Sequence, residues 1–134
     1  MKYTFTFVML LATVTTFCAE NSIASVGSEE EFEQIISKAS QPVVVQFHSG
    51  CPVCNSTRRH LKEIVSEYSE VVFVEIDINV LSDVAEKYNI TALPTVLVFE
   101  PHAIKPRHAI MGPDSKDMLK SKIDETVASL QKTS

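Results

Sequence analysis

Two cysteines three positions apart, Cys51 and Cys54, are the residues of this chain best placed to do chemistry. Such a pair can close into a disulfide and open again, or it can supply half of a zinc site. A β-branched run over 42–47 leads into the pair, and a helical pattern over 55–68 follows it. Strand, turn, cysteine pair and helix is the order typical of a redox motif.

Two other uses of the pair stay open at this point. His48 and His60 could complete a Cys2His2 metal set, or the cysteines could simply pack in the interior. The metal set is disfavoured because His60 lies six positions after Cys54, on a helix that points away from its own start. We therefore expect redox chemistry with no metal. His48 itself could stabilise a thiolate as a cation, or be a solvated turn histidine.

The first 24 residues have the composition of a signal peptide. Lys2 precedes an uncharged run over 3–19 that is rich in Phe, Val, Leu and Thr, and Glu20 ends it. The best cleavage site follows Ala24, with the site after Ala19 as an alternative. We therefore expect a leader over 1–24, a mature domain over 25–134 and a secreted or exported protein, outside the cell or in a periplasm or secretory lumen. Cys18 would leave with the leader.

The composition limits what the mature chain can be. With 134 residues there is room for one domain, and 45% apolar residues are enough for a packed core. The formal net charge of −5 argues against nucleic acid, or an anionic membrane, as the main partner. We expect no membrane attachment after the leader is removed.

The order of predicted elements indicates an α/β fold. Capping and periodicity predict a helix over 28–39, a strand over 42–47, the cysteine helix, a strand over 71–76, a helix over 80–88, strands over 95–99 and 107–111, and a last helix from 114 or 115. The segment 23–26 is a candidate first strand. This order predicts a parallel sheet with helices on both faces and a final hairpin as its antiparallel edge.

Two side-chain placements follow from the helical patterns. In the helix over 80–88, the periodic apolar residues Val80, Leu81, Val84 and Tyr88 are expected to face inwards. In the cysteine helix, Arg58 is expected on the solvated face together with its neighbour Arg59, with steering of charged substrates as the alternative.

The chain resembles the thioredoxin family over about 23–130. Three motifs carry the resemblance: the strand leading into Cys51-x-x-Cys54, the strand over 73–77, and Ala92-Leu93-Pro94-Thr95 before a further strand. The resemblance implies a thioredoxin fold, with a central mixed sheet flanked by helices on both faces. It also implies a thiol–disulfide oxidoreductase without a bound cofactor, in which Cys51 attacks a substrate disulfide and Cys54 resolves the mixed disulfide.

The resemblance further implies where substrates and partners bind. The proline equivalent to Pro94 is cis in this family, and it leaves the backbone of Leu93 and Thr95 free to dock an extended segment. The predicted substrate contacts are therefore Leu93, Pro94 and Thr95, with Pro52 and Val53 beside the cysteines. Partners would be protein cysteines or disulfides and a redox protein that recycles the pair. The alternative is a non-catalytic binding or chaperone module on the same fold.

Three positions depart from the family pattern. Gly50 stands where thioredoxins usually carry tryptophan, and the chain has no tryptophan. Gln46 stands where a buried aspartate assists the resolving cysteine, and Phe73 replaces the lysine that pairs with that aspartate. Because glutamine cannot take a proton, Cys54 would need another base, such as water, or would lose its proton slowly. We regard Gln46 and His48 as possible modulators of the pair.

Overall fold

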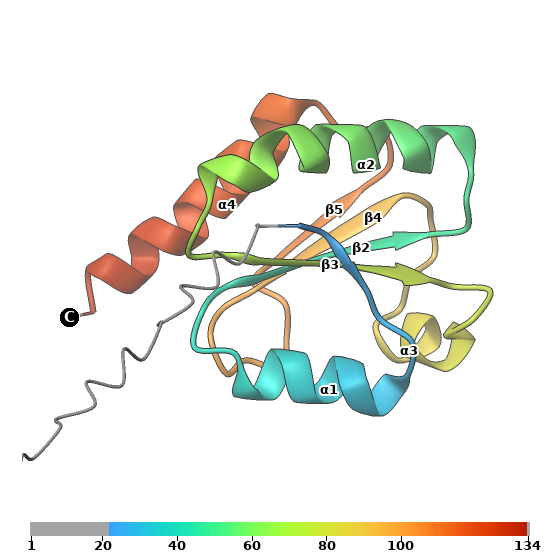
Figure 1. The fold of residues 1–134 in the computed structure, drawn as a ribbon, viewed down its shortest axis with the longest axis horizontal. Coiled ribbons are helices and arrows are strands. Elements are labelled where there is room, and N and C mark those ends of the chain that lie inside the picture. Colours follow the sequence, from blue (N-terminus) through green and yellow to red (C-terminus); the bar gives the residue numbers. More distant parts are fainter. Residues whose placement is uncertain (1–21, 134) are drawn as a thin grey trace, which may run out of the picture.

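The computed structural model describes residues 22–133, which form one sheet between two layers of helices (Figure 1). The layers are α1 (Glu29–Lys38) with α3 (Ser82–Lys87) on one face, and α2 (Pro52–Ile64) with α4 (Lys116–Gln131) on the other. A short 3-10 turn, η1 (Val65–Glu67), extends α2. Residues 1–21 of the predicted leader, including Cys18, lie outside the described residues, so the domain boundary at 25 stays a prediction.

The sheet is mixed, as predicted. Its strands are β1 (Ala24–Ser25), β2 (Val43–His48), β3 (Val72–Asp77), β4 (Thr95–Phe99) and β5 (His108–Met111), in the spatial order β1-β3-β2-β4-β5. The first three run parallel, whereas β4 is antiparallel to both β2 and β5. The hairpin of β4 and β5 is confirmed, and the change of direction begins beside the central strand β2.

Serine caps explain where α1 and α4 start. Ser28 accepts a hydrogen bond from the Glu31 backbone N–H, and the Glu31 carboxylate accepts one from Gly27 N–H at 2.8 Å. This reciprocal pattern satisfies two N–H groups that the helix itself cannot pair. Ser115, one of the two predicted caps of α4, accepts from the Met118 N–H at 3.2 Å. Ser115 is therefore the cap, and Asp114 directly precedes the cap.

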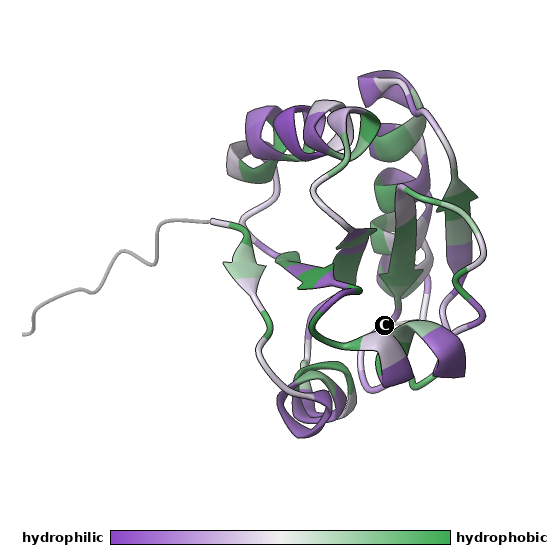
Figure 2. Cartoon of the chain, turned by 90° about the vertical axis from the view of Figure 1, so that its right-hand side faces the viewer, coloured by the Kyte–Doolittle hydropathy of each residue, from purple (hydrophilic) through white to green (hydrophobic). Residues whose placement is uncertain are grey.

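Alternation along the strands separates two cores, one on each face of the sheet. The α1/α3 core contains Val43, Val45 and Phe47 of β2, with Phe32, Val74, Ile76, Leu97 and Phe99. The α2/α4 core contains Val44 of β2, with Leu61, Ile64, Phe73, Val96, Val98, Leu119 and Ile123. Figure 2 shows the hydrophobic strands enclosed between helices whose outer turns are hydrophilic. The two helix layers thus hold β2 at the centre of the domain.

The prediction for Val80 is wrong. Its side chain is 65% exposed, and α3 starts two residues later, at Ser82. The backbone N–H groups of Val80 and Leu81 both bond to the Asp77 carbonyl, so the chain first makes a turn there. Val84 is buried and Tyr88 packs on the α1/α3 core, as predicted. Over 22–133, none of the helices is both long enough and apolar enough to span a bilayer.

Candidate active site

The turn after β2 presents the cysteine pair at the first turn of α2. β2 ends at His48, and Gly50 then adopts a φ of 78°, in the left-handed region that glycine enters without strain. Cys51 is the N-cap residue of α2, and Pro52 occupies its first turn. Proline fits there because its missing N–H has no helical partner to lose. The helix therefore begins directly after Cys51, and the cysteine pair lies in its first turn.

Cys51 and Cys54 form a disulfide, with their Cα atoms 5.0 Å apart. Cys51 is half-buried, whereas Cys54 is 1% exposed. The Cys54 backbone N–H donates to Cys51 Sγ at 3.1 Å. In the reduced pair, this donor and the positive end of the helix dipole favour a thiolate on Cys51. The geometry thus gives the two sulfurs different roles, one accessible and one shielded.

Gln46 lies directly beneath the resolving cysteine. Its side chain is fully buried in β2, and its Nε2 donates to the Cys54 carbonyl at 2.8 Å. Its Oε1 is also buried, and no described residue donates a hydrogen bond to it. Gln46 therefore contacts the cysteine helix at the place where the resemblance puts an acid, but as an amide.

Glu75 and Arg58 form an ion pair beneath α2 that the sequence interpretation missed. The Glu75 carboxylate is 5% exposed, and both of its oxygens lie 2.8 Å from guanidinium nitrogens of Arg58. Ser25 of β1 also donates to this carboxylate, at 3.0 Å. Arg58 is thus not simply on a solvated face, since its guanidinium holds a buried carboxylate. The available signal was one acidic residue inside the β-branched run over 71–76.

The predicted substrate contacts lie in two places, around the start of β4 and in the first turn of α2. The Leu93–Pro94 peptide bond is cis, as predicted, and it directly precedes β4. Thr95 is buried and in register with Phe47 of β2 and Met111 of β5. Pro52 and Val53 are exposed on α2, and Leu93 is half-buried. Their role in substrate binding stays a prediction.

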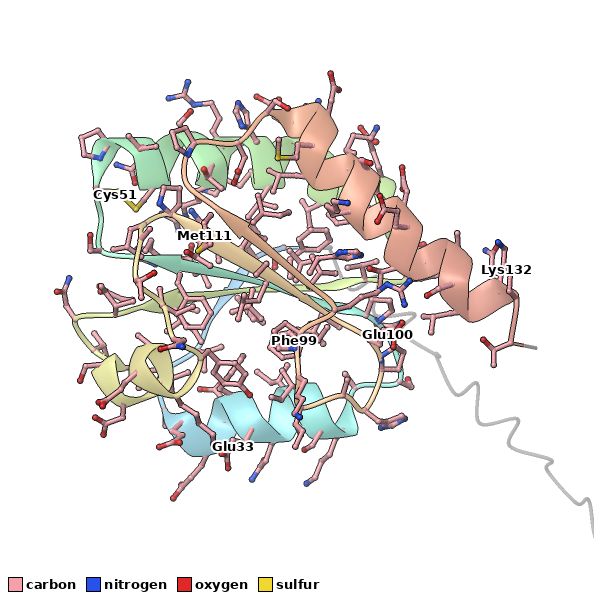
Figure 3. The ribbon with its side chains drawn as sticks, turned by 180° about the vertical axis from the view of Figure 1, so that it is seen from behind. Glu33, Cys51, Phe99, Glu100, Met111 and Lys132 are labelled. Atoms are coloured by element: carbon pink, nitrogen blue, oxygen red, sulfur yellow. A yellow bond between two sulfur atoms is a disulfide. The ribbon has the colours of Figure 1, made fainter. Side chains whose placement is uncertain are left out.

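Met111 is a further exposed apolar residue at this end of the sheet, and sequence analysis did not single it out. Its side chain is 63% exposed, and Figure 3 shows Met111 at the end of the sheet where Cys51 lies. The next residue, Gly112, donates its N–H to the Pro94 carbonyl at 2.8 Å. Only the register of β5 against β4 places Met111 here, and a sequence pattern does not specify that register.

His48 lies at the end of β2, in register with Asp77 of β3, and is half-buried. Its carbonyl accepts a hydrogen bond from the Ile78 N–H at 2.9 Å. Its influence on the cysteines stays a prediction. Within residues 22–133, no three side chains among His, Cys, Asp and Glu are grouped so that they could hold a metal ion.

Comparison with known proteins decides the family. The thioredoxin family model matches residues 23–125, from the segment before β1 into α4. The chain belongs to the thioredoxin family. Thioredoxin of Mycoplasma genitalium is 33% identical over 95 residues, which cover 70% of this chain and 92% of that protein. Thioredoxin C-2 of Corynebacterium nephridii is 31% identical over 102 residues, or 75% and 93% of the two chains.

Solved structures of thioredoxins agree with the observed fold. The Trypanosoma brucei brucei thioredoxin superposes with a TM-score of 0.75, at 23% identity, over 86% of this chain and 99% of that one. The Plasmodium falciparum thioredoxin gives a TM-score of 0.70 at 30% identity, over 77% and 98%. The chain thus belongs to the thioredoxin family and carries a disulfide between Cys51 and Cys54. It is a thiol–disulfide oxidoreductase that acts on protein disulfides.

Proposed function

We propose that the protein is an exported thioredoxin-type oxidoreductase that reacts with protein disulfides through Cys51 and releases them through Cys54. The observation that carries this assignment is the unequal pair at the start of α2. Cys51 is accessible and receives a backbone N–H, whereas Cys54 is 1% exposed. An incoming disulfide therefore reaches only the first sulfur.

The reaction balances as two thiol–disulfide exchanges. In the first, the Cys51 thiolate attacks one sulfur of the substrate disulfide, a mixed disulfide forms, and the other substrate sulfur leaves as a thiolate. In the second, the Cys54 thiol gives up its proton and attacks Cys51 Sγ. The mixed disulfide breaks, the Cys51–Cys54 disulfide re-forms, and the second substrate sulfur leaves. Two electrons pass to the substrate, and a partner dithiol reduces the pair again.

The surroundings of Cys51 suit an extended, largely apolar substrate segment. Val53 is 42% exposed and Met111 is 63% exposed, and Pro52 is exposed between the two cysteines. Leu93 is half-buried next to the cis bond before Pro94. Burying these apolar surfaces under a bound segment would favour binding before exchange occurs. Selection among substrates would then depend on side chains that flank the substrate cysteine.

Export is supported by the sequence of the first residues. Lys2, the uncharged run over 3–19 and the small residues before Val26 form a leader pattern. In an oxidising compartment the pair would be held as a disulfide unless a partner supplied electrons. The reduction potential of the pair relative to its partner then decides whether the protein reduces, oxidises or rearranges substrate disulfides.

Insulin reduction in the presence of dithiothreitol tests the redox assignment. The wild-type chain is expected to accelerate the reaction, and Cys51→Ser is expected to reduce it to the uncatalysed rate. Cys54→Ser should also lose turnover, but it should accumulate mixed disulfides with substrate because the resolving sulfur is absent. Cys18→Ser is the matched control, since its cysteine lies in the predicted leader, and it should keep the wild-type rate.

Equal rates for wild type and Cys51→Ser would refute the redox assignment and favour a non-catalytic binding module. Absence of a trapped species from Cys54→Ser would refute the division of roles between the two sulfurs. Export is checked on the same material, by the mass of the protein recovered outside the cytoplasm. A chain retaining residues 1–19 inside the cell would contradict it.

A further inference from the structure

We propose that Gln46 is a redox-linked positioning residue, whose Oε1 accepts a hydrogen bond from the Cys54 thiol when the pair is reduced. This bond exists only in the dithiol, so Gln46 shifts the equilibrium of the pair towards the reduced state. The proposal rests on one part of the proposed function, namely that the Cys51–Cys54 disulfide can be reduced and re-formed.

The orientation of the amide is set by its other end. Nε2 donates to the Cys54 carbonyl at 2.8 Å, and turning the amide over would place two acceptor oxygens against each other. Oε1 is therefore the amide atom that this hydrogen bond leaves unused. It is buried, and no described residue donates to it while the disulfide is closed. A buried acceptor without a donor destabilises the state that contains it, so the oxidised state carries a cost that a new donor can remove.

Reduction creates such a donor close to the amide. Opening the disulfide places a hydrogen on Cys54 Sγ, in a residue that is 1% exposed and already hydrogen-bonded to Gln46 through its carbonyl. A thiol is a weak donor, but in this position water has little access to compete for it. Gln46 is thus able to bond both the backbone and the side chain of the resolving cysteine.

The charged groups near Gln46 do not offer a better partner for that hydrogen. Glu75 is the register neighbour of Gln46 on β3, and its carboxylate is engaged by Arg58 of α2 and Ser25 of β1. His48, two residues along β2 from Gln46, points to the same face at the end of the strand. The ion pair has little net charge, and Cys54 is 1% exposed, so burial favours the uncharged thiol over a thiolate.

The balance of the step is that of ordinary disulfide reduction. A partner dithiol forms its own disulfide, the Cys51–Cys54 bond breaks, and two electrons pass to the pair. The two protons released by the partner dithiol, or equivalents from water, allow two thiols to form. One proton stays on Cys54 Sγ, where Gln46 Oε1 holds it, and Cys51 is free to lose the other.

The redox equilibrium of the pair tests the proposal directly. Wild type and Gln46→Leu, which keeps a side chain of similar size without the amide, are equilibrated with dithiothreitol or glutathione buffers. Thiols are then alkylated, and the Cys51–Cys54 peptide is quantified by mass spectrometry, separately from Cys18. The fraction reduced in a given buffer should correspond to an equilibrium constant roughly five-fold less favourable to the dithiol in the variant, as expected for loss of one hydrogen bond.

A second readout separates this linkage from a simple loss of stability. Gln46→Leu removes the Nε2 bond in both redox states, but it removes the proposed Oε1 bond only in the reduced state. Denaturant unfolding should therefore show a larger destabilisation of the reduced form than of the oxidised form. Thr126→Val is the matched control, because Thr126 is fully buried on α4 and bonds to the Lys122 carbonyl, away from the pair. It should destabilise both forms equally.

Equal destabilisation of the two forms by Gln46→Leu, or an unchanged redox equilibrium, would overturn the proposal. If the leucine variant does not fold, Gln46→Met provides the same comparison with a flexible side chain that fills similar volume. The outcome is independent of the insulin assay. A wild-type chain that fails to reduce insulin, yet shows the shifted equilibrium in Gln46→Leu, would refute the proposed function and leave this inference standing.

Discussion

The two faces of the sheet differ in what they bury. On the α1/α3 face, Phe32 makes edge-to-face contacts with Phe47, Tyr88 and Phe99 at centroid distances of 5.6–6.5 Å. On the α2/α4 face, the interior includes the amide of Gln46 and the carboxylate of Glu75. On the first face, the buried polar residue Thr95 lies on the same side of β4 as Leu97 and Phe99, and its hydroxyl bonds to the Ala92 carbonyl. The second face instead buries an amide and a carboxylate beneath the cysteine helix.

This difference suggests that the α1/α3 face mainly stabilises the fold, whereas the α2/α4 face also influences the cysteine pair. Aromatic and aliphatic packing stabilises the fold without influencing the charge of a nearby sulfur. Polar groups under α2 contribute less to stability, because each must be desolvated before it is paired. They do, however, set the hydrogen bonds and charges that surround Cys54. Changes on the α1/α3 face should therefore alter stability alone, and changes on the α2/α4 face should alter redox behaviour as well.

The largest expected effect is on the α1/α3 face. Phe32→Ala removes a ring that is fully buried and contacts three other rings, so the free energy of unfolding should fall by about 4 kcal/mol. The redox equilibrium of Cys51–Cys54 should not change. Phe73→Ala, on the opposite face, is the matched comparison. Phe73 is also buried, but among the aromatic pairs described its ring contacts one other ring, that of Tyr68.

Denaturant unfolding of both variants measures this difference. Phe73→Ala should cost about 3 kcal/mol, at the lower end of the range for buried phenylalanine. If Phe32→Ala costs no more than Phe73→Ala, the aromatic contacts of the α1/α3 core add nothing to simple burial. If Phe32→Ala shifts the redox equilibrium, the proposed separation between the two faces is wrong.

The ion pair on the α2/α4 face should give the next largest effect. Arg58→Met leaves the Glu75 carboxylate, which is 5% exposed, without its guanidinium partner. Because the arginine is itself 41% exposed, some water can reach the site, and we expect a loss of about 2 kcal/mol. Arg58→Met combined with Glu75→Leu should recover most of that loss, since an apolar pair needs no charge compensation.

A double-mutant cycle in denaturant checks this expectation, with Arg59→Met as the control on the exposed side of α2. The control should change stability by less than about 0.5 kcal/mol. Failure of the double variant to recover would mean that the ion pair contributes net stability, in contrast to the general cost of burying charge. The proposed difference in stability between the two faces would then depend only on the aromatic contacts around Phe32.

The strands and helix starts were predictable because their signals are local. The β-branched runs became β2, β3 and β4 at nearly the expected residues, and Ser28 and Ser115 cap the helices that they precede. Such patterns depend on a few neighbouring residues and need no knowledge of the sheet order. The cis bond before Pro94 was implied by family resemblance, through the motif around it, and the structure confirms it.

The ion pair and the exposure of Val80 were not predictable in the same way. Arg58 meets Glu75 only because β3 lies parallel to β2 at a register that places Glu75 opposite Gln46, beneath α2. Helical periodicity placed Val80 inwards, but the turn around the Asp77 carbonyl delays the helix until Ser82. The ion pair depends on the register between two strands, and the exposure of Val80 depends on a turn that competes with the helix. A periodic sequence pattern carries no information on either.

The smallest expected effect concerns Asp114, at the start of α4 and on the face that carries the cysteines. Its Oδ2 is buried without a hydrogen-bond partner among the described residues. Burial raises the pKa of Asp114 from its ordinary 3.8 to about 6, although nearby His60 of α2 opposes the shift. The folded state therefore binds this proton more tightly than the unfolded chain. Stability contributed by the protonated form is lost as the pH rises from about 4 to about 6.

Asp114→Asn should remove that loss, because the amide has no charge to desolvate. At pH 7 the variant should be more stable by about 1 kcal/mol, after allowance for partial exposure. Its stability should also vary less between pH 4 and pH 6 than that of the wild type. Asp117→Asn, an exposed acid in the first turn of α4, is the control and should be slightly destabilising. An Asp114→Asn variant less stable at pH 7 would show that attraction to the helix N-terminus outweighs burial, and that the polar groups of this face are better paired than the comparison assumes.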